Sequence, residues 1–423
     1  MSAALAIRPL ARPPDATLSV PGSKSISNRA VLLAGLADGR SELSGALFSD
    51  DTRYMVEALR ALGAGVAADA AAARLVVDGC GGRWPNPHSE LYVGNAGTAM
   101  RFLVAALCLG DGQHRIDGSA RMRERPIGEL CDALRQLGAA VTDSGGTPPV
   151  TAAGPLHGGR AELSAARSSQ FLSALLQVAP YAQTDVTIVL RGEVIAQPYV
   201  DMTVALMAQW GVQVGRDGYR EFRVLAGQRY RAQRFAIEPD ASSAHYFLAA
   251  AALTGGQVRV RGLTRSSPQG DVRFADLLAR MGAHVAWQPD AIEVRGPAQL
   301  DGIDADMNAI SDTAPTLAVL APFASGPVHI RNVAHLRWQE SDRLHAVATE
   351  LARLGVRVDE RPDGLSVWPS PITPAAVHTY DDHRIAMAFA LIGLKVPGIR
   401  IEDPSCVAKT FPDYFERLEE LRR

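Results

Sequence analysis

The sequence has few cysteines and no excess of charge of either sign. Its four cysteines are Cys80, Cys108, Cys131 and Cys406, which lie too far apart to form a metal-ligand spacing. Reduced thiols in a cytosolic protein are the simplest interpretation. Lysine and arginine number 43 against 45 aspartates and glutamates, so the sequence lacks the basic field expected of a protein that binds nucleic acid or membrane surfaces. Any positively charged site must therefore be local.

Long apolar runs are also absent. No run reaches the length that crosses a bilayer. Arg8 and Pro9 break the first apolar stretch, so we expect no secretory signal. The apolar fraction of 47% is ordinary for a globular protein, and 423 residues allow two or three domains.

What the chain does contain is an internal repeat. Five amphipathic helical patterns each end at a glycine, after which a valine begins a predicted strand. The glycines are 71 to 75 residues apart, at Gly63, Gly138, Gly211, Gly282 and Gly355. A glycine at this place suits the position just beyond a helix end, where the backbone turns left-handed. A fixed period of this length indicates a repeat architecture.

A second set of predicted helices alternates with the first. These helices cover 30–36, 102–109, 171–178, 247–253, 317–323 and 387–394. They are apolar nearly all round, so we expect them to be buried and the amphipathic helices to lie outside. The pattern amounts to six units, each with two helices and several strands. Six units are too many for one small core, and a division into three plus three is natural.

The predicted boundary between the two halves follows from a proline. Pro239, between Glu238 and Asp240, interrupts the chain between a predicted strand and the fourth buried helix. We therefore predict one domain at 22–239 with repeats one to three, and a second at 1–21 and 240–423 with repeats four to six. The hinge is expected near 19–22 and 238–241. A first strand around 5–10 could belong to either half.

One stretch, Gly94–Arg101, stands between two apolar runs and predicts a strand end, a tight turn and a helix start. Gly94 and Gly97 allow the backbone to turn sharply and to approach a ligand closely. Thr98 is the expected N-cap. Free N–H groups at a helix start attract an anion, and Arg101 adds a cation suited to phosphate or carboxylate. The alternative is a plain turn with a capped helix.

Polar residues precede all six apolar helices. Serine, threonine, aspartate and asparagine are expected there as caps whatever the function. Capping does not explain the other residues found there, which are Lys24, Arg29, Arg101, Gln170 and Arg384. If each half packs its buried helices in parallel, their N-termini emerge on one face, and two such faces would form a cleft for polyanions. The glycine and serines around Lys24 do not form a phosphate-binding P-loop, because the upstream glycine is missing.

Further cations flank this set. They are Arg121, Arg123 and Arg125 in one loop, Arg343 at the start of an amphipathic helix, and Lys409 in a loop before the last helix. Taken singly, each is more often a solvated charge or half of a local ion pair.

These motifs together resemble the 5-enolpyruvylshikimate-3-phosphate synthase family. The matching segments cover nearly the whole chain: 21–25 with 28–29, 94–101, 121 with 125–127, 168–170, 340 with 342–343, 382–384 and 409–412. The resemblance implies an α/β (α+β) fold, a two-domain inside-out α/β barrel in which each domain has three βαβαββ repeats with buried parallel helices.

The resemblance also implies a reaction. The family transfers the enolpyruvyl group of phosphoenolpyruvate to shikimate 3-phosphate and releases phosphate, without a metal or an organic cofactor. Its known inhibitor is glyphosate. We expect a cytoplasmic monomer with small-molecule substrates and no nucleic-acid or membrane partner.

The site residues below are carried over from the family onto matching positions. Shikimate 3-phosphate is expected to contact Lys24, Ser25, Arg29, Ser168, Ser169, Gln170, Tyr199, Asp312, His335 and Gln339. Phosphoenolpyruvate is expected to contact Lys24, Asn95, Gly97, Arg125, Gln170, Arg343, Arg384 and Lys409. Asp312 is the expected proton acceptor and Glu340 the expected donor, and Lys24 joins them as a catalytic residue that touches both substrates. The substrates together carry a charge on the order of −5 to −6, which calls for several cations.

Four positions depart from the family pattern: Ala196 stands in place of serine, Gln339 of lysine, His335 of asparagine and Phe102 of proline. The lost hydroxyl and cation should weaken phosphate binding by a few kcal/mol at most. We expect His335, or a neighbouring arginine at 331 or 337, to compensate. A raised KM for shikimate 3-phosphate with retained activity is the predicted result.

Two other functions are alternatives to this one. UDP-N-acetylglucosamine enolpyruvyltransferase shares the architecture but carries a reactive cysteine in a loop, whereas 121–125 has none and Cys131 falls inside a predicted helix. A catalytically inactive anion-binding scaffold would be expected to lose acid or base residues, yet Lys24, Asp312 and Glu340 are present.

Overall fold

The computed structural model describes residues 4–422, and the chain divides into two compact units. The N unit is Gly22–Ile237. The C unit combines Met1–Pro21 with Glu238–Arg423. Each unit has an apolar core of its own. The structure describes no helix long and apolar enough to cross a membrane between residues 4 and 422.

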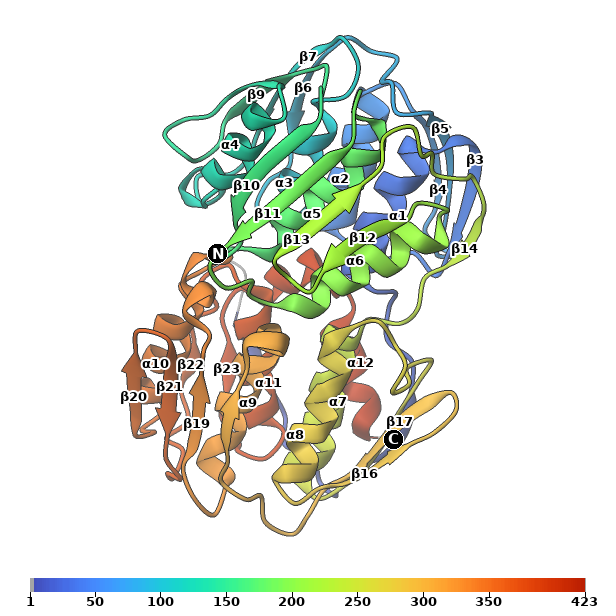
Figure 1. The fold of residues 1–423 in the computed structure, drawn as a ribbon. Coiled ribbons are helices and arrows are strands. Elements are labelled where there is room, and N and C mark those ends of the chain that lie inside the picture. Colours follow the sequence, from blue (N-terminus) through green and yellow to red (C-terminus); the bar gives the residue numbers. More distant parts are fainter. Residues whose placement is uncertain (1–3, 423) are drawn as a thin grey trace. The chain divides into compact units, whose positions relative to one another are not determined.

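The N unit contains twelve strands among its described residues. Most of them are labelled in Figure 1. They are β3 (Asp38–Ser44), β4 (Gly65–Asp69), β5 (Arg74–Cys80), β6 (His88–Tyr92), β7 (Gln113–Asp117), β8 (Ala140–Thr142), β9 (Val150–Ala153), β10 (Gly159–Ser164), β11 (Val186–Arg191), β12 (Val214–Asp217), β13 (Glu221–Val224) and β14 (Arg234–Ala236). They form three sheets with the orders β14-β3-β5-β4, β6-β7-β9-β8 and β10-β11-β13-β12. In each sheet the first pair is parallel and the other pairs are antiparallel.

The C unit repeats this pattern twice and then varies it. Its strands are β1 (Leu5–Ala6), β2 (Asp15–Leu18), β15 (Gln257–Arg261), β16 (His284–Trp287), β17 (Ala291–Arg295), β18 (Asp304–Asp306), β19 (Val328–Arg331), β20 (Val358–Arg361), β21 (Gly364–Val367), β22 (Ala376–Val377) and β23 (Arg400–Ile401). The sheets β2-β15-β17-β16 and β18-β19-β21-β20 match those of the N unit. In the third, β1-β23-β22, the N-terminal strand pairs antiparallel with β23. The first predicted strand, left open between the halves, therefore belongs to the C unit.

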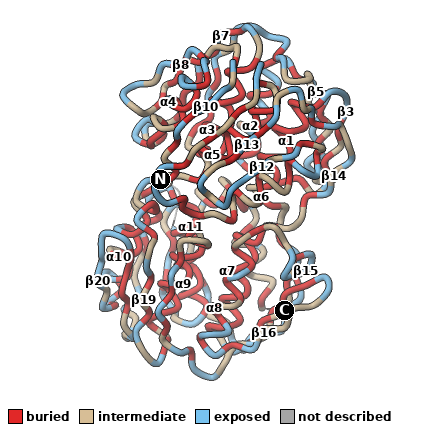
Figure 2. The backbone as a smooth tube through the Cα atoms, in the orientation of Figure 1, coloured by how far each residue is buried: buried red, intermediate tan, exposed pale blue. Residues whose placement is uncertain are grey.

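Six apolar helices fill the interiors of the units, as their all-round apolar pattern predicts. They are α1 (Lys24–Leu36), α3 (Gly97–Ala106) and α5 (Ser169–Val178) in the N unit, and α7 (Ala241–Thr254), α9 (Ala314–Leu320) and α11 (His383–Gly393) in the C unit. Figure 2 shows these helices mostly in the colour of buried residues. The predicted inside-out arrangement, with helices inside and sheets outside, is confirmed.

The amphipathic helices are α2 (Asp50–Ala61), α4 (Gly128–Gln136), α6 (Gln197–Gln209), α8 (Phe274–Arg280), α10 (Arg343–Arg353) and the short α12 (Tyr414–Glu419). Five of them end at the repeated glycine. Gly63 has a φ of +95°, its N–H donates to the Arg60 carbonyl, and the Ala64 N–H donates to the Leu59 carbonyl. This pair of bonds defines a Schellman motif. The other four repeated glycines also have positive φ and make the same two bonds.

Two strands lie on the opposite side of a unit boundary from the helix that follows them in sequence. β2 leads into the N unit but pairs with β15 of the C unit, and β14 leads into the C unit but pairs with β3 of the N unit. The chain therefore crosses between the units at 21–22 and at 237–238. Gly22 is needed at the first crossing, because a Cβ there would lie 1.8 Å from the Gly45 carbonyl oxygen.

Candidate active site

In the N unit, the turn after β6 leads into α3 at Gly97. Gly94 has a φ of +51°, which favours glycine. The N-cap is Ala96, which makes no side-chain cap bond, so the prediction of Thr98 as cap is wrong. Thr98 lies inside the first helical turn instead, and its hydroxyl accepts a 3.5 Å bond from the Gln170 side-chain amide. This bond joins the first turns of α3 and α5.

Arg101, predicted to be an anion-binding cation, has hydrogen-bond partners within the N unit. Its side chain is buried, and its guanidinium donates to the Gly97 carbonyl at 3.3 Å and to the Pro126 carbonyl at 2.8 Å. The residue therefore ties the 121–126 loop to the start of α3. The sequence alone does not indicate this partner, because Pro126 is 25 residues away along the chain.

Asn95, Gly97 and Arg125 do come together. Arg125 is buried, and one guanidinium nitrogen, Nη1, donates to both the backbone and the side-chain oxygen of Asn95, each at 3.1 Å. A Cβ on Gly97 would lie 2.5 Å from the Arg125 Nη2 atom. Only glycine at this position leaves the guanidinium where it is, so the close approach of backbone and cation depends on it.

Lys24 and Ser25 occupy the first turn of α1, and Ser23 caps the helix. The Lys24 ammonium lies 3.8 Å from a carboxylate oxygen of Asp51, a buried residue in the first turn of α2. The sequence alone does not single out Asp51, because an acidic residue in a first helical turn is explained by the helix dipole. Its burial next to a candidate catalytic lysine marks it as part of the site.

Arg29 is fully enclosed in the N unit and has only neutral partners. It donates to Thr203 Oγ1 at 2.8 Å, to the Ser25 carbonyl at 2.9 Å, to the Tyr199 carbonyl at 3.2 Å and to Ser173 Oγ at 3.5 Å. Its guanidinium also lies 5.0 Å from the centre of the Phe102 ring. Burial lowers the pKa of Arg29 to about 10, so the group stays charged at neutral pH. A buried cation held in this way is suited to an anionic ligand.

The remaining N-unit candidates lie at the starts of α5 and α6. Ser168 caps α5 and accepts from the Gln170 backbone N–H, with Ser169 between them. Tyr199 lies in the first turn of α6, and its carbonyl contacts Arg29. Hydrogen bonds of Arg29 to Ser173 and Thr203 connect α1 with α5 and α6. Most of the predicted N-unit residues thus lie at or near the starts of α1, α3, α5 and α6, which are cross-linked by hydrogen bonds.

In the C unit, the candidate base Asp312 lies in a 3-10 turn, Asn308–Thr313, directly before α9. Arg384, in the first turn of α11, donates to one of its carboxylate oxygens at 2.6 Å. Arg343, at the start of α10, donates to the other at 3.2 Å. Two arginines from different helices therefore hold the two oxygens of one carboxylate.

Arg343 is the centre of this network. Besides Asp312, it donates to Glu340 at 2.6 Å and to both oxygens of Asp382, at 2.8 and 3.2 Å. Burial alone would lower the pKa of Arg343. The pKa is nevertheless raised, because the carboxylates of Asp382, Glu340 and Asp312 surround the guanidinium. Lys409 lies 3.9 Å from the second Glu340 oxygen. The C unit thus brings together all five of its predicted reaction residues: Asp312, Glu340, Arg343, Arg384 and Lys409.

A further carboxyl, not found by sequence reasoning, lies behind this network. Asp271 is buried in a 3-10 turn, Gly270–Arg273, and accepts a hydrogen bond from the Ser242 hydroxyl in the first turn of α7. Burial and the nearby Asp312 raise the pKa of Asp271. The first turns of α7 and α11 and the 3-10 turn before α9 therefore lie close together, as expected if the buried helices pack in parallel.

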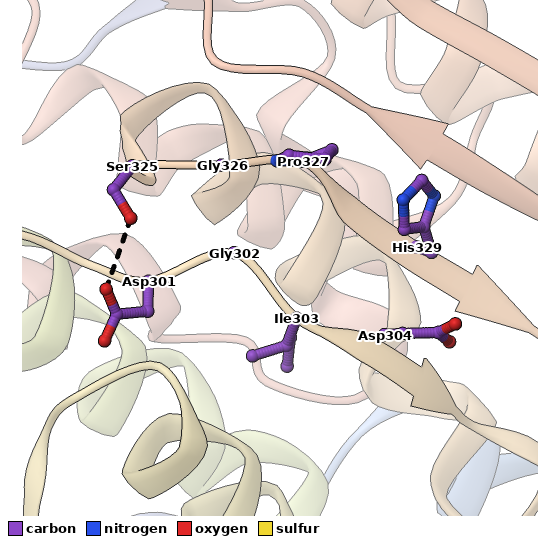
Figure 3. A pocket seen from close by; sticks show the side chains of 8 residues that line it. All are labelled: Asp301, Gly302, Ile303, Asp304, Ser325, Gly326, Pro327 and His329. Atoms are coloured by element: carbon purple, nitrogen blue, oxygen red, sulfur yellow. Dashed lines mark hydrogen bonds between the residues drawn. The ribbon is translucent and has the colours of Figure 1, made fainter.

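Two cavities lie away from these residues. One of about 490 Å³ is lined by 301–304, 325–327 and His329, where Ser325 donates to Asp301 at 3.2 Å (Figure 3). A second, of about 380 Å³, is lined by 88–90, 113–115 and Thr151. Neither contains a predicted site residue. Within residues 4–422, no group of three or more histidines, cysteines or acidic residues could hold a metal ion.

Comparisons with known proteins decide the family. The family model described as EPSP synthase (3-phosphoshikimate 1-carboxyvinyltransferase) matches residues 11–418. The chain belongs to the EPSP synthase family. It is 52% identical over 417 residues to a 3-phosphoshikimate 1-carboxyvinyltransferase of Nostoc sp. (strain PCC 7120), covering 98% of each chain. It is 48% identical over 412 residues to the enzyme so named from Photobacterium damsela subsp. piscicida, covering 96% of each.

The fold comparison agrees. A solved EPSP synthase from Acinetobacter baumannii superposes with a TM-score of 0.83 at 26% identity, covering 98% of this chain and 97% of that one. The family match and the curated relatives favour the EPSP synthase family over the related UDP-N-acetylglucosamine enolpyruvyltransferase, which shares the fold.

Within this EPSP synthase sequence, His335 departs from the family pattern but adds no positive charge. Its ring is buried, and Nε2 lies 2.8 Å from the Ser311 hydroxyl. Burial lowers its pKa to about 4, so the ring is neutral at pH 7. His335 therefore cannot replace the cation lost at Gln339, and it offers a neutral hydrogen bond only.

The two arginines named as alternatives are engaged with carboxylates. Arg331 binds Asp304 at 2.6 Å, and Arg337 binds Asp342 at 3.0 Å and Glu360 at 2.7 Å. The expectation that one of them compensates as a ready cation is therefore not supported. Ala196, the other departure at this site, has a left-handed backbone with a φ of +48° and forms the N-cap of α6.

Proposed function

We infer that this EPSP synthase family member transfers the carboxyvinyl (enolpyruvyl) group of phosphoenolpyruvate to the 5-hydroxyl of shikimate 3-phosphate. The products are 5-enolpyruvylshikimate 3-phosphate and inorganic phosphate. This reaction belongs to the shikimate pathway of aromatic amino acid biosynthesis. One arrangement in the C unit carries the proposal for the residues. The candidate base Asp312 and the candidate acid Glu340 are both bound to the guanidinium of Arg343.

The first half of the reaction is an addition. The 5-hydroxyl oxygen forms a bond to the central carbon of phosphoenolpyruvate while its proton passes to the Asp312 carboxylate. The methylene carbon takes a proton from Glu340, so the double bond becomes a single bond and a tetrahedral adduct results. Two carboxyl groups held at fixed positions suit this paired proton transfer. Arg343 and Arg384 hold the two oxygens of the Asp312 carboxylate in place for this transfer.

The second half is an elimination. Glu340, now a carboxylate, removes a proton from the methyl group of the adduct. The double bond re-forms as the carbon–oxygen bond to phosphate breaks, and the leaving phosphate accepts the proton held by Asp312. Atoms and protons balance over the two halves, and no cofactor is needed for any step.

The N unit is proposed to supply most of the anion binding. Lys24, Arg29 and Arg125 are buried or nearly so, and they stand beside helix starts whose N–H groups favour negative charge. We propose the other substrate contacts as the family resemblance predicts them. The chain segments near 19–22 and 238–241 are proposed as the hinge between the two units.

A phosphate-release assay with purified protein tests the function. We expect release only when both substrates are present, with mass spectrometry detecting the enolpyruvyl product. No release at saturating concentrations of both would overturn the proposal, and release with UDP-N-acetylglucosamine in place of shikimate 3-phosphate would favour the related transferase.

The same assay with added glyphosate, the family inhibitor, measures how sensitive the enzyme with Phe102 at this position is to glyphosate. Light scattering tests the expected monomer, and cell fractionation tests the expected cytoplasmic location.

A further inference from the structure

A tight turn with an unusual residue precedes α11. The Asp382 N–H donates to the Thr379 carbonyl at 2.9 Å, and the two residues between them, Tyr380 and Asp381, have φ values of +55° and +52°. Positive φ at both central positions is typical of a type I′ turn, where glycine, asparagine and aspartate predominate. Tyrosine has no intrinsic preference for this conformation, so contacts elsewhere must hold it.

Glu350 supplies those contacts. This carboxylate, on α10, is 1% exposed. One of its oxygens accepts from the Tyr380 hydroxyl at 2.9 Å, and the other accepts from the His378 backbone N–H at 3.0 Å. Arg353, one turn further along α10, pairs with both oxygens at 2.9 and 2.6 Å. Glu350 therefore grips the chain on the N-terminal side of the turn and at its first central residue.

The turn sets the position of the reaction network. Asp382, the residue directly after it, caps α11 and binds Arg343 and the Ser341 hydroxyl. Arg384, two residues later, binds Asp312. α10 thus holds the segment at two points, with Arg343 bound to Asp382 and Glu350 bound to His378 and Tyr380.

We propose that Glu350 and Tyr380 are positioning residues that hold this left-handed turn and thereby fix Asp382 and Arg384 for the reaction. The proposal rests on the function inferred above. Neither residue touches a proposed substrate. The contacts of Glu350 with Tyr380 and His378 are called the clamp. The backbone of 380–384 connects this clamp to Arg384, which binds the candidate base.

The test compares two substitutions at Tyr380. Tyr380→Phe keeps the ring and removes the hydroxyl that Glu350 binds, so we expect the KM for phosphoenolpyruvate to rise about fivefold or more, with kcat reduced. Tyr380→Asn removes the whole ring but supplies a residue that favours the left-handed region, so the turn needs less support. We expect its KM to lie closer to the wild-type value than that of Tyr380→Phe. A purely structural role predicts the reverse order, because asparagine loses more contacts.

A matched control is available in the N unit. The Tyr219 hydroxyl donates to Asp201 of α6 at 2.6 Å, again a tyrosine bound to a carboxylate on an outer helix. Tyr219→Phe should leave both KM values unchanged. Glu350→Gln should raise the KM for phosphoenolpyruvate in the wild-type background and raise it less in the Tyr380→Asn background.

Several results would overturn the clamp. One is a wild-type KM for phosphoenolpyruvate in Tyr380→Phe. Another is a KM in Tyr380→Asn that equals or exceeds that of Tyr380→Phe. A third is a lowered melting temperature of Tyr380→Phe with unchanged kinetics. If Tyr380→Phe does not fold, the comparison is made between Glu350→Gln and Tyr380→Asn. A wild-type protein that releases no phosphate overturns the proposed function instead, so the two failures are distinct.

Discussion

Two buried arginines, one in each unit, have opposite surroundings. Arg29 of the N unit meets hydroxyls, backbone carbonyls and the Phe102 ring, and no described carboxylate pairs with it. Arg343 of the C unit meets Asp312, Glu340 and Asp382. Burial lowers the pKa of the first, whereas three carboxylates raise the pKa of the second.

The difference separates two uses of a cation. A buried charge without a counter-charge is costly to the folded protein and is offset when an anion binds, so Arg29 suits substrate recognition. A charge that is already matched offers little net attraction, but it fixes the carboxylates around it. Arg343 therefore suits the placement of groups that transfer protons.

The largest expected effect comes from the carboxylate on which the C-unit arginines converge. Asp312→Asn keeps the shape of the side chain but removes its capacity to accept a proton. We expect turnover to fall by about 10²- to 10⁴-fold in the phosphate-release assay. Asp304→Asn, which alters an exposed carboxylate of the same unit, is the control. Near-normal turnover in Asp312→Asn would remove the residue from the mechanism.

Stability measurements test the comparison directly. Arg343→Met leaves buried carboxylates without their partner and should cost about 3–5 kcal/mol in the free energy of unfolding. Arg29→Met removes a cation with no described carboxylate partner, so its cost should be smaller, about 1 kcal/mol, arising from lost hydrogen bonds. Urea unfolding of the substrate-free protein measures both. Equal costs would show that the two environments do not differ energetically.

The pH dependence of stability sharpens the account of the C unit. The pKa of His335 is about 4 in the folded protein against 6.5 ordinarily, so the unfolded chain binds more protons between these values. The stabilisation is complete above pH 6.5 and is lost as the pH falls towards 4. His335→Asn should therefore gain about 2 kcal/mol relative to wild type between pH 7 and pH 5.

Urea midpoints at the two pH values provide the measurement. A difference between variant and wild type that stays constant with pH would mean that His335 is not the group responsible.

The smallest expected effect concerns the departures from the family pattern. Ala196→Ser in the N unit restores a hydroxyl, and Gln339→Lys in the C unit restores a cation. Each should lower the KM for shikimate 3-phosphate by about three- to tenfold, the range of one net hydrogen bond. Steady-state kinetics of the single variants show which unit lost more binding, and an unchanged KM in both would refute the predicted weakening.

Several parts of the candidate site could be predicted from the sequence. Lys24, Gln170 and Arg384 were predictable as binding residues because they stand at helix starts, where capping does not explain them. Arg101 also stands at a helix start, and the sequence did not indicate that its guanidinium binds the Pro126 carbonyl. A side chain's partner depends on which distant segment packs beside it, and local pattern carries no information about that.

Other parts were invisible for related reasons. Asp51, Asp271 and Glu350 look like ordinary acidic residues of helices and turns, and only their burial beside Lys24, Ser242 and Tyr380 gives them meaning. The pairing of β2 with β15 and of β14 with β3 was equally hidden, because parallel pairing joins strands with no short connection between them.

The amino-acid sequence by itself determined the period of the repeat, the helix ends at five glycines and the burial of six apolar helices. These features arise from interactions within a few residues and from the apolar pattern of single helices. The tertiary structure decided which charges are matched. Electrostatic energy depends on distances between groups far apart in the chain, so only packing could distinguish Arg29, enclosed by neutral groups, from Arg343, held among three carboxylates.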